Sequence, residues 1–214
     1  APSAVSIAGT VAATTGTITL GDAGTVVTVT DNATVGGAAT GTIDLGNVII
    51  NNGKLLTVGT GIANIINMDT VSGVANDTAS NLTINTTGLV TVGGAVGTDI
   101  GTLTVQNSGG ANFQSTVDAA NVAITASANA TTVAFLNNLT VGAGMTVAAA
   151  GANNYNVSIT GTTNSIAGTT TFANGGTVTL GDASGDSTTF EGGVTATARS
   201  AVNIAGTVAA TTGT

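Results

Sequence analysis

The sequence predicts an all-β chain that folds as a parallel β-helix, a β-solenoid of about ten coils with roughly 19 residues each. Three observations lead to this prediction. Short segments alternate aliphatic residues with threonine, pairs rich in glycine and asparagine separate them, and similar segments recur at a regular spacing. The same features leave no window with a sustained helical period, and glycine would interrupt a helix wherever one began.

The two ends of the chain carry nearly the same sequence. Residues 3–17 read SAVSIAGTVAATTGT and residues 200–214 read SAVNIAGTVAATTGT, so they differ only at Ser6 and Asn203. We therefore expect residues 1–214 to form a single solenoid segment. That segment would be one period of about 197 residues, plus a short overlap, of a tandem array or a head-to-tail filament.

The predicted strands place aliphatic side chains on one face and threonine on the other, as the period of two in a β-strand requires. They include residues 17–20, 56–58, 90–92, 103–105, 139–141 and 177–180. Gly-Gly, Asn-Gly and Asn-Asn pairs between strands supply turn conformations. These pairs lie at 36–37, 52–53, 93–94, 137–138 and 175–176.

The length of one coil follows from internal repeats. Residues 6–10 and 16–23 reappear as 165–169 and 176–183 with one residue inserted, and TTFANGG at 170–176 resembles TTFEGG at 188–193. The five aromatic residues recur at similar steps; they are Phe113, Phe135, Tyr155, Phe172 and Phe190. A unit of about 19 residues also fits a β-hairpin. We prefer the coil, because stacked coils place like residues on like and explain an internal aromatic stack with one ring per coil.

Composition is typical of a narrow solenoid. Aromatic residues are 2% and charged residues 6% of the chain, so the apolar content consists mainly of small aliphatic side chains that cannot fill a thick core.

The net charge of −8, with only Lys54 and Arg199 positive, predicts no binding to nucleic acid and repulsion from anionic membranes. No apolar run approaches the roughly 20 residues of a membrane-spanning helix. No signal peptide begins the chain, which indicates that it was removed or that the chain is an internal piece.

Several segments resemble a known class of surface protein. GTITLGDAG, GTVTLGDASGD, LVTVGGAVGTDIGTLTV and FANGGTVTLGD are similar to the passenger regions of bacterial autotransporter adhesins, in particular the rickettsial outer membrane proteins A and B. The resemblance implies a bacterial, extracellular β-helical protein that serves in adhesion or as a surface coat.

No catalytic, cofactor-binding or metal-binding residue is predicted, and we do not expect an enzyme. The chain has no histidine and no cysteine, so the usual nucleophile–base pairs cannot form. Calcium is the best inorganic candidate, because Asp182, Ser184, Asp186 and Glu191 offer oxygen ligands around a glycine-containing loop. The EF-hand glycine and terminal glutamate are misplaced, however, and we favour a solvated turn.

Threonine pairs suggest a second kind of surface. Thr-x-Thr occurs at residues 17 and 19, 28 and 30, 102 and 104, 169 and 171, 177 and 179, and 195 and 197. Stacked on a flat sheet, these pairs would resemble the array of ice-binding solenoids, although their spacing is irregular and Asp44 interrupts the set. Threonine is also a favourable strand residue in its own right.

The sequence therefore favours a structural repeat of an extracellular fibre or cell-surface coat, whose uncapped ends join other copies head to tail. An adhesin that binds a cell surface or matrix is the alternative, with candidate contacts in residues 107–112 and at Asn153 and Asn154. An ice- or mineral-binding threonine face is a second alternative. We expect no cofactor, no nucleic-acid partner and no membrane span.

Overall fold

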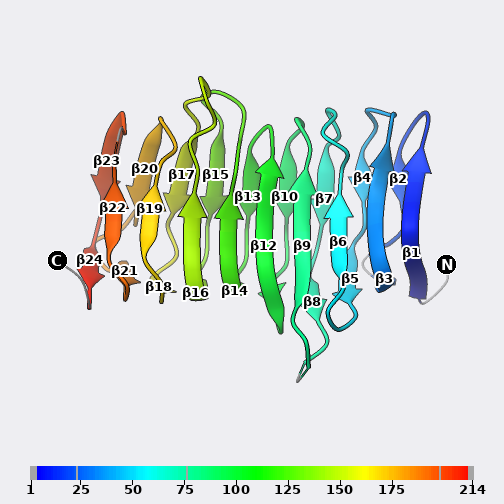
Figure 1. Ribbon diagram of the computed structural model, residues 1–214, viewed down its shortest axis with the longest axis horizontal. Helices are drawn as coiled ribbons and strands as arrows, with labels where there is room; N and C mark the ends of the chain where they lie inside the picture. The colour runs from blue at the N-terminus through cyan, green and yellow to red at the C-terminus, as the bar shows by residue number, and fades with distance from the viewer. Residues whose placement is uncertain (1–3, 23, 76, 198, 212–214) are drawn as a thin grey trace.

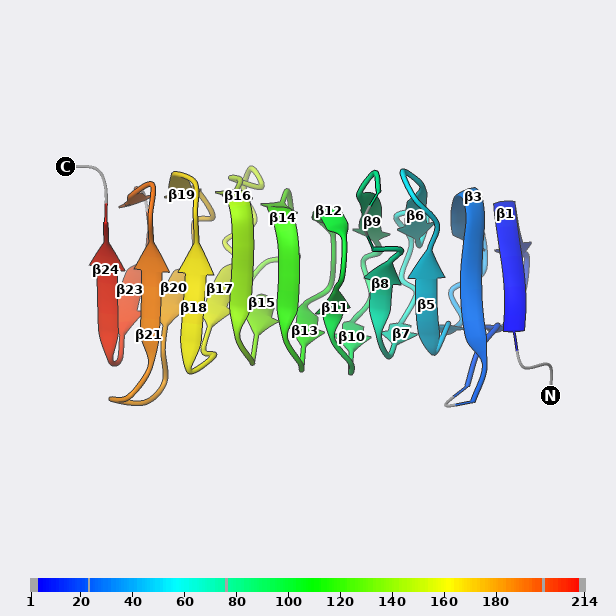
Figure 2. The ribbon, with the colours of Figure 1, turned by 90° about the horizontal axis from the view of Figure 1, so that it is seen from below.

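The computed structural model describes residues 4–22, 24–75, 77–197 and 199–211, and it confirms the parallel β-solenoid (Figure 1). The regular elements of these residues are all β-strands, and the strands within each sheet pair in parallel. No described segment forms an apolar helix long enough to cross a membrane. The chain advances along one axis, so its first and last described strands lie at opposite ends (Figures 1 and 2).

Each turn has three sides, and the equivalent sides of successive turns stack into three ladders that we call the first, second and third faces. The first face, seen in Figure 2, begins with the N-terminal part of β1 (Ala4–Ala13) and of β3 (Val26–Gly37). It continues through β5 (Asn47–Ile50), β8 (Val71–Gly73), β11 (Val96–Gly97), the N-terminal parts of β14 (Val117–Ile124) and β16 (Leu139–Val147), β18 (Thr163–Ile166), β21 (Ser187–Phe190) and β24 (Thr207–Ala210).

The second face follows each first-face strand after a corner. It contains the C-terminal parts of β1, β3, β14 and β16, together with β6 (Leu55–Val58), β9 (Ser80–Asn85), β12 (Ile100–Asn107), β19 (Thr170–Phe172) and β22 (Val194–Ala196). Because four strands continue around this corner, the first two faces form one 15-stranded sheet.

The third face is a separate nine-stranded sheet that lies behind the second face in Figure 1. Its strands are β2 (Ile18–Thr19), β4 (Ile43–Asp44), β7 (Ile66–Met68), β10 (Val90–Val92), β13 (Ala111–Phe113), β15 (Thr132–Phe135), β17 (Asn156–Ile159), β20 (Thr177–Leu180) and β23 (Ala201–Ile204). The described residues thus make about nine turns.

A turn is longer than the sequence repeats predicted. On the third face Ile18 pairs with Ile43 at one end and Val178 with Val202 at the other. One turn therefore takes about 23 residues on average, where the repeats had suggested roughly 19 residues. The estimate was too short because it equated residues on different faces. Phe172 lies on the second face and pairs with Ala196, whereas Phe190 lies on the first face, so the step between these two rings is less than a full turn.

The core is a narrow column that runs the length of the solenoid. In β9 the side chains of Ser80, Leu82 and Ile84 are buried and those between them are partly exposed, so the strand points every second residue inward. Small aliphatic side chains from all three faces fill the column, as composition predicted.

The expected single aromatic stack is wrong in its extent. Phe113 and Phe135 are paired residues of the third face, and their rings stack with centroids 5.0 Å apart. Phe172 and Phe190 meet edge to face at 6.1 Å. Tyr155 precedes β17, and its hydroxyl donates a hydrogen bond to the Ala148 carbonyl at 2.6 Å. Burial raises the pKa of this phenol to about 12, so Tyr155 stays protonated at neutral pH.

Buried polar groups connect the turns at the corners. Asn164 is buried, its Nδ2 donates to the Gly161 carbonyl at 2.7 Å, and its Oδ1 accepts the Leu139 amide of the preceding turn at 3.0 Å. A buried amide with both ends bonded holds its corner in one register.

The two kinds of sequence repeat have different structural outcomes. The two copies of the internal repeat are structurally equivalent, because Ile18 and Val178 occupy the same place on the third face, seven turns apart. The two copies of the terminal repeat lie on different faces. Its first copy forms β1 on the first and second faces, and its second copy forms β23 on the third face and β24 on the first. Ser3 and residues 212–214 of the two copies lie outside the described residues.

Candidate functional site

One column of threonine runs along the second face. Successive paired positions on this face are threonine at eight of nine turns, with Ala123 the exception; they are Thr10, Thr34, Thr57, Thr83, Thr104, Ala123, Thr146, Thr171 and Thr195. From Thr34 to Thr171 these side chains alternate with buried ones and so point outward. Paired strands place neighbouring hydroxyls roughly 4.8 Å apart along the axis.

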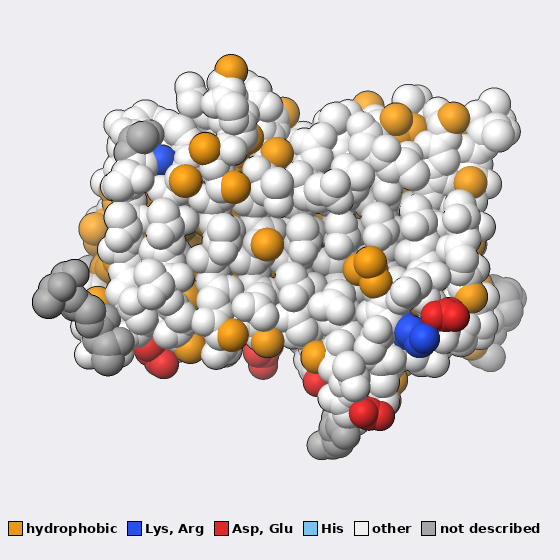
Figure 3. Space-filling view, in the orientation of Figure 1, with side chains coloured by type: hydrophobic (Ala, Val, Ile, Leu, Met, Phe, Trp, Pro, Cys, Tyr) orange, Lys and Arg blue, Asp and Glu red, His pale blue; other side chains and the backbone are white. Residues whose placement is uncertain are grey.

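The surface around this column is uncharged. None of the second-face segments contains Asp, Glu, Lys or Arg. Figure 3 shows the charged side chains toward the margins of this face and none across its middle. All five aromatic side chains are buried, so the face also offers no aromatic ring to a ligand.

The predicted Thr-x-Thr pairs do not gather on one face. Thr102 and Thr104 lie on the second face, whereas Thr177 and Thr179 lie on the third and Thr28 lies on the first. The column takes a single residue from each turn and is threonine at eight of nine turns, so the Thr-x-Thr pairs could not reveal it without the correct turn length.

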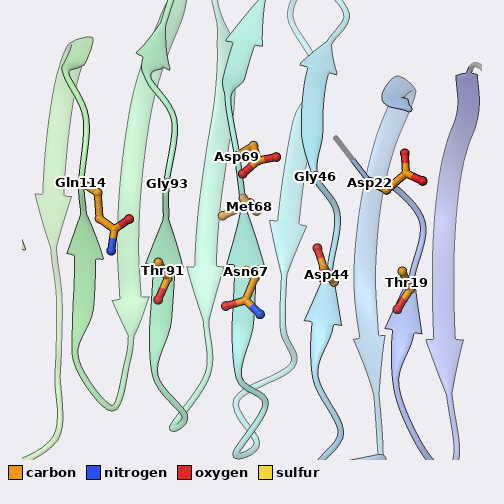
Figure 4. Close-up of a pocket in the computed structure, with 11 residues that line it drawn as sticks. Thr19, Asp22, Asp44, Gly46, Asn67, Met68, Asp69, Thr91, Gly93 and Gln114 are labelled. Atoms are coloured by element: carbon orange, nitrogen blue, oxygen red, sulfur yellow. The ribbon is translucent and has the colours of Figure 1, made fainter. Parts of the chain in front are cut away.

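A shallow groove of about 450 Å³ crosses the outer surface of the third face in the first turns (Figure 4). One row of polar side chains comes from the strands, where Asp44 pairs with Thr19 and Asn67. A second row comes from the corners that follow. The complete lining is Thr19, Gly21, Asp22, Asp44, Gly46, Asn67, Met68, Asp69, Thr91, Gly93 and Gln114.

Glycine makes the groove possible at its rim. A Cβ on Gly21 would lie 2.1 Å from the Leu45 carbonyl oxygen, so the corner can pack this tightly only without a side chain. Asp22, Asp44 and Asp69 reach the groove from successive turns, because each follows the one before it by close to one turn of the chain. The Gly24 amide donates to Asp22 at 3.0 Å and is the main cause that lowers the pKa of this carboxyl.

The groove offers hydrogen-bond acceptors and no activated nucleophile. Within the described residues no three acidic side chains are grouped so that they could hold a metal ion. Carboxylate, amide and hydroxyl oxygens in its lining can accept hydrogen bonds from hydroxylated or cationic solutes.

The candidate calcium loop is organised by one of its own carboxylates. Asp186 is buried, and it accepts the backbone amides of Asp182 and Ala183 at 2.8 and 2.9 Å. Glu191 lies at the other end of β21, where its Oε1 accepts the Ser165 hydroxyl at 3.2 Å. The structure therefore does not bring the four candidate oxygen ligands together, and Asp186 closes a turn.

This turn predicts a pH effect on stability. The two amide hydrogen bonds lower the pKa of Asp186 below its usual 3.8, so its contribution is present above pH 3.8 and is lost as the pH falls through the folded-state pKa. We expect Asp186→Asn to lower the melting temperature at pH 7 and to reduce its fall between pH 4 and pH 2. Asp118→Asn, at an exposed carboxylate of the first face, is the control. Identical acid profiles for wild type and Asp186→Asn would argue against this role.

The adhesin candidates lie in two different settings. In residues 107–112, Ser108 is buried and bonds the Ser127 hydroxyl at 2.8 Å, so this segment is a packed corner. Asn153 and Asn154 are exposed in the loop before β17, where the Asn154 amide donates to Asn129 at 3.0 Å. The structure does not bring the two candidates into one groove.

The last turn leaves core positions open. Val202 and Ile204 are 43% and 59% exposed, whereas their partners one turn earlier, Val178 and Leu180, are 0% and 4% exposed. Val194 on the second face is 36% exposed for the same reason.

No protein-family description, curated protein or solved structure matches this chain.

Proposed function

We propose that this chain is a non-catalytic structural repeat of an extracellular fibre or surface coat, in which solenoid segments join end to end. The observation that carries the proposal is the open last turn. Its core side chains are in register with buried ones and have no turn above them in the described residues. A further turn stacked there would bury them and would pair the free edges of β22, β23 and β24.

The first turn can supply that further turn. β1 and β2 each pair along one edge only in the described residues, so their other edges face outward along the axis. Because the strands are parallel, the two ends of the segment differ. Contact between unlike ends generates a filament that does not close. The extracellular location is proposed from the resemblance to autotransporter passengers.

End-to-end association can be tested by placing a charge in the open turn. We expect the wild-type chain to sediment as a concentration-dependent series of oligomers, and Ile204→Asp to shift it at least tenfold toward monomer, because the charge would be buried in the joint. Leu136→Asp is the matched control, since Leu136 is 49% exposed on the side of the solenoid. Association that is absent in wild type, or that Ile204→Asp leaves unchanged, would contradict the proposal.

The threonine column favours ice binding as a second candidate function. An uncharged row of hydroxyl and methyl groups at the strand spacing, interrupted at Ala123, complements a partner that repeats at a similar spacing. None of its hydroxyls forms a hydrogen bond with another described residue, so all are free to face a lattice. The absence of charge and of exposed rings on this face makes mineral and carbohydrate surfaces poorer partners.

Thermal hysteresis tests this second function. We expect the wild-type chain to depress the freezing point below the melting point, and Thr83→Lys or Thr104→Lys to abolish most of the effect by interrupting the column. Thr179→Lys, at an outward position of the third face, serves as the control. No hysteresis in the wild type, or equal loss in the control, would exclude ice binding through the second face.

A further inference from the structure

The two copies of the terminal repeat have a similar local backbone shape but lie on different faces of the solenoid. In the first copy β1 continues through an Ile-Ala-Gly corner where its pairing register shifts, and in the second copy the same corner joins β23 to β24. The corner glycines Gly9 and Gly206 have similar positive φ values of 69° and 79°. In the first copy this corner joins the first face to the second, and in the second copy it joins the third face to the first.

The distance of 197 residues between the two copies explains why they lie on different faces. Val5 lies on the first strand of the first face and Val202 on the ninth strand of the third face, which is eight complete turns and two further sides along the chain. A 197-residue period is therefore one side short of nine turns. A corner of the solenoid is a local structure, so the same sequence forms it equally well at another corner.

We infer that successive 197-residue units are rotated by one side of the solenoid about its axis, so that the first face of each unit continues the third face of the unit before it. This inference rests on the proposed function, since it describes how one unit meets the next. Three units restore the original orientation. A surface such as the threonine column is then displayed on each side of the fibre in turn, about one third of a rotation apart.

The inference fixes which strands touch at the joint. In a continuous array the second unit's residues 4–13 take the places of Ala201–Ile204 and Thr207–Ala210, so this joint overlaps the units by one repeat. It therefore differs from the joint between two separate chains, in which β1 adds a turn above β23 and β24. The second unit's β2 then lies on the second face, above β22, which sets Thr19 of the second unit beside Thr195 of the first. In an array without rotation, Thr19 would remain on the third face and lie beside Thr179, because β2 would stack on β20.

Disulfide trapping separates the two arrangements, because the chain has no cysteine of its own. The protein to test is a two-unit chain in which residue 200 of the first copy is followed by residue 4 of the second. Paired residues on neighbouring strands lie roughly 4.8 Å apart, within the range that a disulfide spans. We expect Thr195→Cys with Thr19→Cys of the second unit to oxidise, and Thr179→Cys with the same partner to retain both thiols.

Each outcome decides the question. Oxidation of the Thr179 pair alone would overturn the rotation and leave end-to-end continuation intact. Failure of both pairs to oxidise in a folded chain would overturn the rotation. If the wild-type chain also forms no oligomers in the sedimentation experiment, the proposed function has failed with it. Circular dichroism of each double variant in its reduced form confirms that the outward-facing substitutions leave the sheets folded.

Discussion

Phe135→Ala is expected to lower the free energy of unfolding by about 3 to 5 kcal/mol, the range for removal of a fully buried ring. Phe135 is 0% exposed, and its ring stacks on Phe113 of the neighbouring turn at 5.0 Å. The narrow column has few side chains that could move into the space, so the cavity would persist. Urea unfolding followed by circular dichroism measures the loss.

The next residue in the chain provides the control. Leu136 is 49% exposed, and Leu136→Ala should change the free energy of unfolding by less than about 0.5 kcal/mol. Equal effects of the two substitutions would mean that adjacent side chains do not point to opposite sides of the wall, and the assigned strand register would be wrong.

Gly168→Ala is expected to cost about 3 kcal/mol because two turns touch at this corner. A Cβ on Gly168 would lie 1.8 Å from the Ala143 carbonyl oxygen of the preceding turn. The backbone cannot yield locally, since Ala143 lies within β16 and the strands on either side are held by ladder hydrogen bonds. The corner would have to open and separate paired strands.

Gly185→Ala is the matched comparison for this glycine. A Cβ at Gly185 meets no atom within 4 Å, so this variant should be as stable as the wild type or slightly more stable. Thermal unfolding of both variants tests the close contact between turns. A Gly168→Ala protein with wild-type stability would show that the turns are not stacked this tightly.

The sequence was sufficient to predict the fold class because most strands repeat the same local pattern. Alternating residues such as Thr177-Val178-Thr179-Leu180 can bury only one side, and a chain poor in aromatic residues must keep that buried side thin. The equivalence of residues 16–23 and 176–183 was also visible, because it spans whole turns.

The turn length was not predictable from the aromatic residues. Any large side chain can fill the column from any of three faces, so their spacing need not equal one turn. The acidic groove was missed for the same reason. That Asp22, Asp44 and Asp69 line one groove follows only from the true turn length, and corners of variable length conceal that period. The threonine column required the same knowledge, since it takes one residue from each turn.

Cryo-electron microscopy of the assembled protein tests most directly whether open-ended segments continue into one another. We predict thin fibres in which strands stack at about 4.8 Å along the axis, without interruption at the joints. Because one unit makes about nine turns, the axial repeat of a unit should be roughly 40 to 45 Å. Compact, separate particles, or fibres whose strand stacking stops at each joint, would contradict the account.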